Sequence, residues 1–224
     1  MGRERGLSAV SCVLAAGNPG RVRWMEAVLS PLGYRVRPQS EFEFEQPPEA
    51  GGTFSEGAMI KARAAAAETG LPAIADDSGL EVAALGGAPG VRSARYSGEH
   101  GNDAANNAAL LKALEGQRRR QARFRCVCVC LRHAADPAPL IAQGVWPGRI
   151  MTELQGLDGF GYDPLFQPAG LNCSAAELSP EEKNRRSHRG QAVQALVTQL
   201  RTQPFPSRLL STSDSAANRP CSHP

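Results

Sequence analysis

The order of apolar and polar positions along the chain predicts strands and helices that alternate. Short apolar runs predict strands at residues 10–15, 34–37, 73–75, 122–131 and 140–146, and a further strand around 149–154. Apolar residues at helical spacing predict helices at residues 21–29, 54–69, 102–114 and 180–202, the last with a break near Gly190. This order of elements predicts an α/β fold.

The composition indicates how the chain is organised into domains. The chain has 224 residues, of which 42% are hydrophobic and only 5% aromatic, so we expect helices packed closely on a sheet within one domain. From residue 203 onward the helical spacing gives way to Pro, Ser, Thr and Asn. We therefore expect a single domain over residues 8–202 and a disordered tail over residues 203–224.

Charge and cysteine content exclude several classes of protein. A net charge of +3, from 25 basic and 22 acidic residues, argues against a protein that coats nucleic acid. No apolar run is long enough for a membrane span and no signal peptide is visible, so we expect a cytoplasmic protein. Cys126, Cys128 and Cys130 alternate along a predicted strand and are expected to be buried thiols in a reducing compartment.

A glycine turn follows the first predicted strand. It consists of Ala16, Gly17, Asn18, Pro19, Gly20 and Arg21. Backbone N–H groups at the start of a helix favour a bound anion, and the arginine adds positive charge. The turn has neither a P-loop nor a dinucleotide-binding pattern, so a purely structural turn is an equal alternative.

An acidic turn, Asp76-Asp77-Ser78-Gly79, directly follows the predicted strand 73–75. Ligands of open α/β sheets bind beyond the carboxyl ends of strands. Two neighbouring carboxylates repel each other unless a cation compensates, and Mg²⁺ prefers such oxygen ligands. A carboxylate here can also activate water. The alternative is an Asp-rich turn that caps the next segment.

Other charged residues are informative only in context. Glu45 and Glu49 lie in a loop, Glu56 follows at the start of the helix 54–69, and Lys61 and Arg63 lie further along that helix. A loop glutamate can reach the same cation as the acidic turn, but such residues are more often solvated. The two basic residues can face phosphates or water.

A fourth group combines an aromatic turn with downstream basic residues. The turn contains Gly159, Phe160, Gly161, Tyr162 and Asp163, and the basic residues are Lys183, His188 and Arg189. An aromatic ring between glycines can stack on a base, and a basic side chain can donate to a purine O6. Surface positions are the alternative. The residues alone therefore predict a nucleotide or phosphate ligand with metal assistance.

In this order the motifs resemble the inosine/xanthosine triphosphate pyrophosphatase family. The resemblance covers about residues 8 to 202 and is carried by these segments: residues 14–18, 53–56, 75–82, 85–91, 93–96, 159–164 and 182–190. It implies an elongated α/β fold with a mixed central sheet flanked by helices and two lobes with a cleft between them. It also implies a homodimer that hydrolyses ITP, dITP and XTP to the monophosphate and pyrophosphate.

The resemblance also implies roles for individual residues. It assigns water activation and a Mg²⁺ contact to Asp77, and a second metal contact to the loop residue Glu49. It assigns phosphate binding to residues 16–21 and Ser78, and substrate support to Lys183. The base pocket would comprise Phe160, Gly161, Tyr162, Asp163, His188 and Arg189.

Several positions depart from the family pattern. Ala16 replaces a hydroxyl residue, Arg21 replaces Lys, Trp24 replaces Glu and Gly57 replaces Asn. These departures leave two alternatives open beside an active enzyme for deaminated purines. One is a nucleotide-binding protein of the same fold that has lost catalysis, and the other is a pyrophosphatase for another modified nucleotide.

Overall fold

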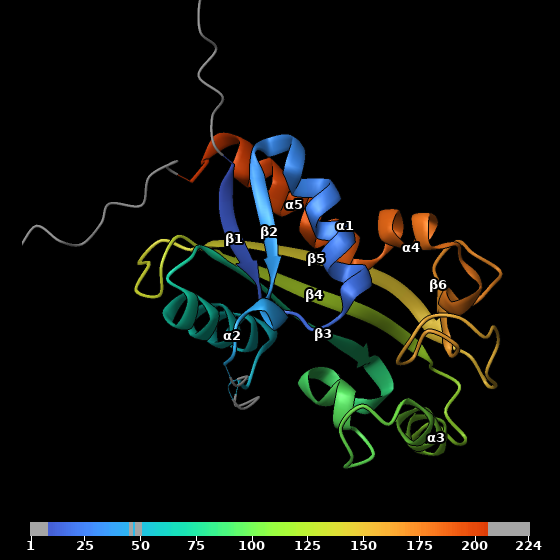
Figure 1. Cartoon of the computed structure of the whole chain (residues 1–224). Helices are drawn as coiled ribbons and strands as arrows, with labels where there is room; N and C mark the ends of the chain where they lie inside the picture. The colour runs from blue at the N-terminus through green and yellow to red at the C-terminus, as the bar shows by residue number, and fades with distance from the viewer. Residues whose placement is uncertain (1–8, 45–46, 48–50, 206–224) are drawn as a thin grey trace, which may run out of the picture.

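A single mixed sheet of six strands lies at the centre of the computed structural model, which describes residues 9–44, 47 and 51–205 (Figure 1). The strands are β1 (Val10–Leu14), β2 (Tyr34–Pro38), β3 (Ala73–Val82), β4 (Gln121–Leu131), β5 (Leu140–Ile150) and β6 (Phe166–Pro168). Their order across the sheet is β2-β1-β3-β4-β5-β6. The prediction of an α/β fold with a mixed central sheet is confirmed.

The strands pair in two different ways. β1 is parallel to both of its neighbours, β2 and β3, whereas β3, β4, β5 and β6 are antiparallel in succession. β1 and β3 share only two partner pairs, and β1 ends at Leu14, opposite Ile74. β3 then continues to Val82 in full register with β4. The second half of β3 therefore extends beyond the carboxyl end of β1, where it is open to ligands.

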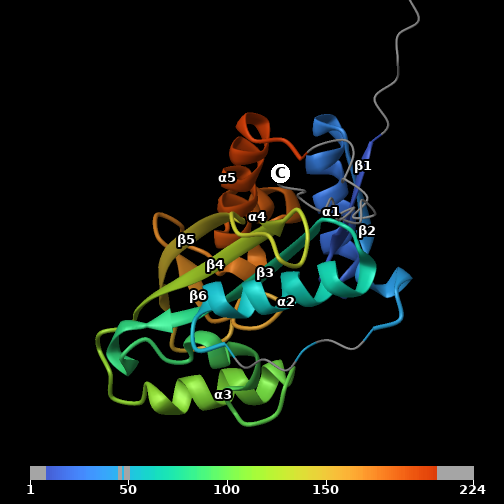
Figure 2. The ribbon, with the colours of Figure 1, turned by 90° about the vertical axis from the view of Figure 1, so that its left-hand side faces the viewer.

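Helices cover both faces of the sheet (Figure 2). The α-helices are α1 (Pro19–Leu29), α2 (Phe54–Thr69), α3 (Asp103–Ala113), α4 (Pro180–Arg186) and α5 (His188–Thr202). The short 3₁₀ helices are η1 (Ser30–Leu32), η2 (Gln39–Glu41), η3 (Ala83–Leu85), η4 (Gly90–Arg95) and η5 (Ala175–Glu177). α1 and α5 share a buried cluster on one face of the sheet, and α2 packs on the other.

Small side chains bring α2 close to the sheet. Ala58, Ala62 and Ala65 on its inner face are fully buried. Thr53 begins the helix with a capping box, in which its side chain accepts from the Glu56 amide while the Glu56 carboxylate accepts from the Thr53 amide. The helix therefore projects its first turns over the middle of β3.

A third buried cluster lies at the far end of the sheet. It joins α3 and η5 to the distal halves of β3, β4 and β5, with residues such as Leu80, Leu110, Phe124 and Phe166. Figure 1 shows α3 at the opposite end of the molecule from β1 and β2. This cluster packs α3 and the loop before β6 against the far end of the sheet.

For two strands, the predicted end of the strand was wrong. β3 does not stop at Ala75, because the antiparallel ladder with β4 holds the following residues extended, including Asp76 and Asp77. β5 is one continuous strand through Pro147 and Gly148, and the separate strand expected at 149–154 does not exist. Gly148 fits there because its missing side chain leaves room for the Phe166 ring and the Gln167 carbonyl.

The predicted break in the last helix exists, slightly before Gly190. It falls at Ser187, whose extended backbone ends α4 and whose hydroxyl accepts from the Gly190 amide to begin α5. Gly190 itself is helical and packs tightly, since a Cβ there would lie 1.8 Å from the Asn184 carbonyl oxygen. The glycine therefore permits close packing of the two helices rather than causing the break.

The three strand cysteines are buried free thiols, as predicted, and lie in the cluster under α5. Phe205 also packs into this cluster, where its ring meets Tyr34 edge-on. The helices in the described part of the chain all lack the length and apolar composition of a membrane span. The disordered tail was predicted to begin at residue 203, and this boundary is wrong because Phe205 is buried in the core; residues 206–224 lie outside the described residues.

Candidate functional site

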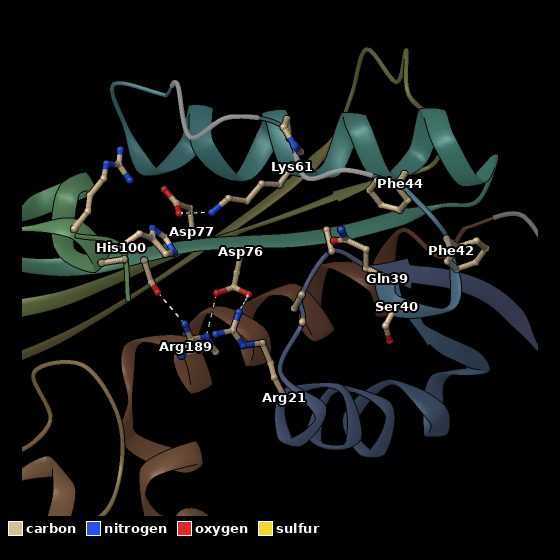
Figure 3. Close-up of a pocket in the computed structure, with 17 residues that line it drawn as sticks. Arg21, Gln39, Ser40, Phe42, Phe44, Lys61, Asp76, Asp77, His100 and Arg189 are labelled. Carbon is tan, nitrogen blue, oxygen red and sulfur yellow. Dashed lines mark hydrogen bonds and ion pairs between the residues drawn. The ribbon is translucent and has the colours of Figure 1, made fainter. Parts of the chain in front are cut away.

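A cavity of about 930 Å³ lies at the open half of β3 (Figure 3). Its wall combines segments that are far apart in sequence: the end of β1, the first turn of α1, the segment after β2, helix α2, the loop after η4 and the start of α5. The charged and titratable residues in its lining are Arg21, Lys61, Asp76, Asp77, Arg95, His100 and Arg189. Basic groups outnumber acidic ones, as a polyphosphate site requires.

The strand conformation separates the two aspartates. Side chains alternate along a strand, so Asp76 and Ser78 point toward α1 and α5, whereas Asp77 points toward α2 (Figure 3). The sequence had suggested two carboxylates that share one cation. Instead, each carboxylate has its own basic partners on its own face of the sheet.

Asp76 is a buried ionic junction. Its Oδ1 lies 3.1 Å from Arg21 Nη1 and its Oδ2 lies 3.0 Å from Arg189 Nε. Burial opposes ionisation of this carboxyl group, but the charges of Arg189 and Arg21 and the Arg189 hydrogen bond outweigh it and hold the pKa below its usual range. Asp76 is therefore ionised and anchors two arginines at the cavity.

Asp77 lies in a different electrostatic environment. Its Oδ1 accepts from Lys61 Nζ at 2.8 Å, and both side chains are mostly buried. Burial raises the pKa of Asp77 above its usual value, although the Lys61 hydrogen bond and charge act in the opposite direction. Gly57 leaves room for this carboxylate, because a Cβ there would lie 2.5 Å from Asp77 Oδ2. Asp77 thus has the properties of a general base beside a fixed cation.

The predicted glycine turn contributes only part of its length to the cavity. Ala16, Gly17 and Arg21 line it, together with the preceding Ala15. The Asn18 side chain instead caps α1 by accepting from the amides of Gly20 and Arg21, and Pro19 occupies the first helical position. Two N–H groups at the start of the helix therefore have a partner within the protein.

The aromatic turn lies beside two basic residues. The Phe160 ring is half-exposed, with Lys183 Nζ 4.6 Å and Arg189 Cζ 5.8 Å from its centre. Asp163 is buried, accepts from the Phe160 amide at 2.8 Å, and forms an ion pair with Lys183. An exposed aromatic face next to ordered cations fits a flat, polar ring such as a purine.

Two members of the predicted base pocket point elsewhere. Tyr162 is buried in the far cluster, and its hydroxyl donates to the Ser93 carbonyl at 2.8 Å. Burial raises the pKa of Tyr162, as do Tyr96 and Asp103, so it stays protonated. Gly161 offers its backbone, and both its N–H and its carbonyl bond to α3. These residues shape the turn rather than the surface of a pocket.

His188 is a buried aromatic residue in this structure. Its ring stacks on Phe124 with centres 4.7 Å apart and planes 10° apart, and the ring of Trp146, the cross-strand partner of Phe124, lies 6.5 Å from it. Burial and the neighbouring Arg189 lower its pKa well below the usual value, so the ring is neutral. Its Nδ1 has no hydrogen-bond partner among the described residues.

The predicted metal contact of Glu49 lies outside the described residues. Within the described part of the chain, no three His, Cys, Asp or Glu side chains are grouped as a metal centre. Asp77 nevertheless presents carboxylate oxygens at the cavity, which suits a hard cation held by one or two carboxylates and substrate phosphates.

Sequence reasoning left some cavity residues undecided or missed them. Lys61 faces the cavity, whereas Arg63 donates to backbone carbonyls of the β4–β5 connection. Arg95 and His100 also line the cavity and were not among the predicted site residues. The basic residues around the motif 93–96 were the available signal, but only tertiary structure brings them into the same cavity as Asp77.

Comparisons with known proteins assign the family. The chain matches the Ham1 family over residues 12–199. A dITP/XTP pyrophosphatase of Thioalkalivibrio sulfidiphilus is 56% identical over 190 residues, which cover 84% of this chain and 97% of the relative. A dITP/XTP pyrophosphatase of Vibrio cholerae is 52% identical, with 85% and 96% covered. The chain belongs to the Ham1 family, and the resemblance found in its sequence is confirmed.

Solved structures agree with this assignment. A HAM1 protein from Coxiella burnetii is 48% identical and superposes with a TM-score of 0.82, covering 86% of this chain and 99% of that one. A nucleoside-triphosphatase, dITP/XTP pyrophosphatase, from Mycobacterium abscessus is 43% identical with a TM-score of 0.71, covering 84% and 98%. The α/β fold described above is therefore the fold of this family.

Proposed function

We propose that this protein hydrolyses the deaminated purine nucleotides ITP, dITP and XTP to the monophosphate and pyrophosphate. The observation that carries the proposal is the cavity, which is lined by Asp77, a general base ion-paired with Lys61, and by a cluster of basic side chains. The names of the relatives, dITP/XTP pyrophosphatases, support the same substrates and the same reaction. Removal of these nucleotides would keep them out of the nucleotide pool.

Asp77 is the proposed base. It accepts a proton from the water that attacks the α-phosphorus, and the bond from that phosphorus to the bridging oxygen breaks to release pyrophosphate. A raised pKa makes its carboxylate a stronger proton acceptor than an ordinary aspartate. Lys61 fixes the orientation of the carboxylate at 2.8 Å and adds positive charge beside the reacting phosphate.

Residues on the other face of β3 bind the polyphosphate. Arg21 and Arg189 are oriented by Asp76, and Ser78 accepts from Arg189 Nη2 at 2.8 Å. A guanidinium has five N–H donors, so Arg21 keeps donors for phosphate oxygens while it holds Asp76, and Arg189 keeps donors for the base. The proposal extends this role to the turn of residues 16–21, where Ala16 lacks a hydroxyl donor but Arg21 supplies charge.

The base is proposed to stack on Phe160, with Lys183 and Arg189 as donors near its polar edge. A deaminated purine carries an oxygen at the position where adenine carries an amino group. A site with fixed donors leaves its own polar groups unpaired when adenine enters, and therefore rejects it strongly. His188 and Tyr162 contribute by supporting the residues around this site.

Mg²⁺ is the proposed cofactor, with Asp77 and Glu49 as its protein contacts. The metal would neutralise phosphate charge and polarise the reacting phosphorus.

The chain is further proposed to act in the cytoplasm as a homodimer, and it is not proposed to bind nucleic acid stably. Light scattering of the purified protein at several concentrations tests the dimer, and a constant monomer mass would contradict it.

The deciding experiment measures pyrophosphate release from dITP, XTP, dGTP, dATP and modified pyrimidine nucleotides, with and without Mg²⁺. The proposal expects rapid release from dITP and XTP only when Mg²⁺ is present. Equal rates on all purines would contradict the specificity. Fast release from a modified pyrimidine alone would favour that class of substrate, and tight dITP binding without release would favour a binding protein that has lost catalysis.

A further inference from the structure

The loop before the aromatic turn is exposed and is held to its neighbours at Gln155, whose amide donates to the Pro164 carbonyl at 2.9 Å and whose carbonyl accepts from the Ser174 hydroxyl at 2.7 Å. Residues 152–160 are all exposed, and Leu157 in this stretch is fully so. Phe160 at its end is half-exposed as well. A side chain in such a loop keeps a fixed position only if hydrogen bonds hold the backbone on either side of it.

One anchor lies within the turn and connects it to α4. Asp163 accepts from the Phe160 amide and forms an ion pair with Lys183. Gly159, at φ +85°, leaves the space that the Asp163 carboxylate occupies, because a Cβ there would lie 2.6 Å from Asp163 Oδ2. This anchor holds the two ends of the turn to each other and to α4.

The second anchor comes from the first turns of α3. Asp103 Oδ2 accepts from the Gly161 amide at 2.6 Å, and Asn107 Nδ2 donates to the Gly161 carbonyl at 2.8 Å. The two residues are four positions apart and therefore share one face of the helix. Asn107 is 5% exposed, and its Nδ2 also donates to the Asp103 carbonyl at 2.9 Å. Both backbone groups of Gly161 are thus fixed by α3.

Asn106, the next residue on α3, holds a different segment. Its Oδ1 accepts from the Ser97 amide at 2.8 Å and its Nδ2 donates to the Ala94 carbonyl at 3.2 Å. Ala94 lines the cavity. Neighbouring asparagines on one helix therefore fix two segments: Asn106 fixes the end of η4, which lines the cavity, and Asn107 fixes the aromatic turn.

We propose that Asp103 and Asn107 are positioning residues that hold the aromatic turn, residues 159–163, and thereby set the selectivity for the base. This inference rests on the proposed function, in which Phe160 stacks on the base. Rejection of a wrong base requires donors and the stacking ring to stay in fixed positions, and displacement by about 1 Å costs up to a hundredfold in rate. α3 touches no substrate in this scheme and acts through the backbone of Gly161.

The test compares Asn107→Ala and Asp103→Ala with Asn106→Ala as the matched control. Each asparagine substitution removes two hydrogen bonds from the same helix, but only Asn107 touches the turn. The ratio of kcat/KM for dITP over dATP is expected to fall about tenfold in both turn variants. Asn106→Ala loosens a part of the cavity that both substrates share, so it is expected to change kcat/KM for both alike and to leave the ratio unchanged. Asp103→Asn retains an oxygen acceptor and is expected to restore most of the ratio.

Amide hydrogen exchange supplies a readout that does not depend on activity. Exchange in residues 159–163 is expected to be faster in Asn107→Ala and Asp103→Ala than in the wild type or in Asn106→Ala. Unchanged exchange in the turn, or an unchanged dITP preference in both turn variants, would overturn the inference while the proposed function stands. A wild type without any dITP preference would overturn the proposed function and, with it, the selectivity role of α3.

Discussion

The two adjacent aspartates of β3 illustrate how strongly neighbouring residues can differ in ionisation. Asp76 meets two arginines, which lower its pKa, whereas burial raises the pKa of Asp77. The cause is the alternation of side chains along a strand, which directs the residues to opposite faces of the sheet. One aspartate is therefore suited to hold cations in place and the other to accept a proton.

Substitution of Asp77 by Asn tests its role as the base. The amide keeps the shape of the side chain but accepts protons poorly, so we expect pyrophosphate release from dITP to fall by at least about a hundredfold. Thermal unfolding should show a folded protein. Activity near that of the wild type would remove Asp77 from the reaction.

The Lys61→Met variant tests how Lys61 affects the pKa of Asp77. The Lys61 hydrogen bond and charge lower the pKa of Asp77, so their loss should raise it further. Because the base acts in its ionised form, the acidic limb of the pH profile of kcat/KM should move to higher pH. Lys61→Arg keeps the charge and should leave the limb close to its original position. An acidic limb that does not move in Lys61→Met would show that another group controls it.

At the scale of the element, close contact between β5 and α5 determines where the basic residues lie. Gly144 faces the start of α5, and a Cβ there would lie 2.0 Å from the His188 carbonyl oxygen and 2.6 Å from the Ala192 amide nitrogen. Both atoms belong to the backbone and cannot move aside by a change of rotamer. The glycine thus sets the distance at which α5 presents Arg189 to β3.

Gly144→Ala is therefore expected to destabilise the protein by about 2–3 kcal/mol, since α5 must shift to admit the methyl group. Gln143→Ala, at the exposed neighbouring position, should change the free energy of unfolding by less than about 0.5 kcal/mol. Urea denaturation of the two variants measures both values. Equal stabilities would mean that β5 and α5 are not in such close contact.

The elements also show what the sequence could and could not predict. Apolar periodicity located most helices and strands, because it reports the faces that a helix or strand buries. It ended β3 at Ala75 because charged residues resemble a turn when the partner strand is unknown. It split β5 after Trp146, because Pro147 and Gly148 are typical turn residues. Pairing with β4 decides both cases, and that pairing is not encoded in any local pattern.

The site was predictable to a similar extent. The motifs indicated Asp77, Phe160 and Lys183, because these residues lie in long, ordered segments that resemble a known family. The role of Lys61 stayed open, since its position on α2 does not reveal which neighbour it faces. Asp103 lies in the predicted helix 102–114, and nothing local reveals its contact with Gly161, 58 positions away, which depends on the tertiary fold.

At the scale of the whole molecule, Asp76 joins three elements that meet at the cavity. Arg21 belongs to α1 and Arg189 to α5, and both contact the same carboxylate of β3. The side chain of Asp76 is 3% exposed. The ionic junction therefore links the two helices that cover one face of the sheet.

Asp76→Asn should destabilise the protein by about 3 kcal/mol at neutral pH, because it leaves two guanidinium groups without their counter-charge. The pKa of Asp76 is lowered from 3.8 in the folded state, so its contribution is present above that pH and is lost as the pH falls toward the lowered value. The difference in unfolding free energy between wild type and variant should accordingly shrink below about pH 4. A difference that stays constant from pH 6 to pH 2 would contradict this account.

The packing of Phe205 has a consequence for the connectivity of the chain. Tyr34 pairs with Val10 at the start of β1, and its hydroxyl accepts from the Phe205 amide at 3.0 Å, so the first and last described segments share one neighbour. A short linker can therefore join them, and new ends can be opened in the exposed segment 115–119. Such a circular permutant would place α3 at the end of the polypeptide, although its contacts in space would be those of the natural order.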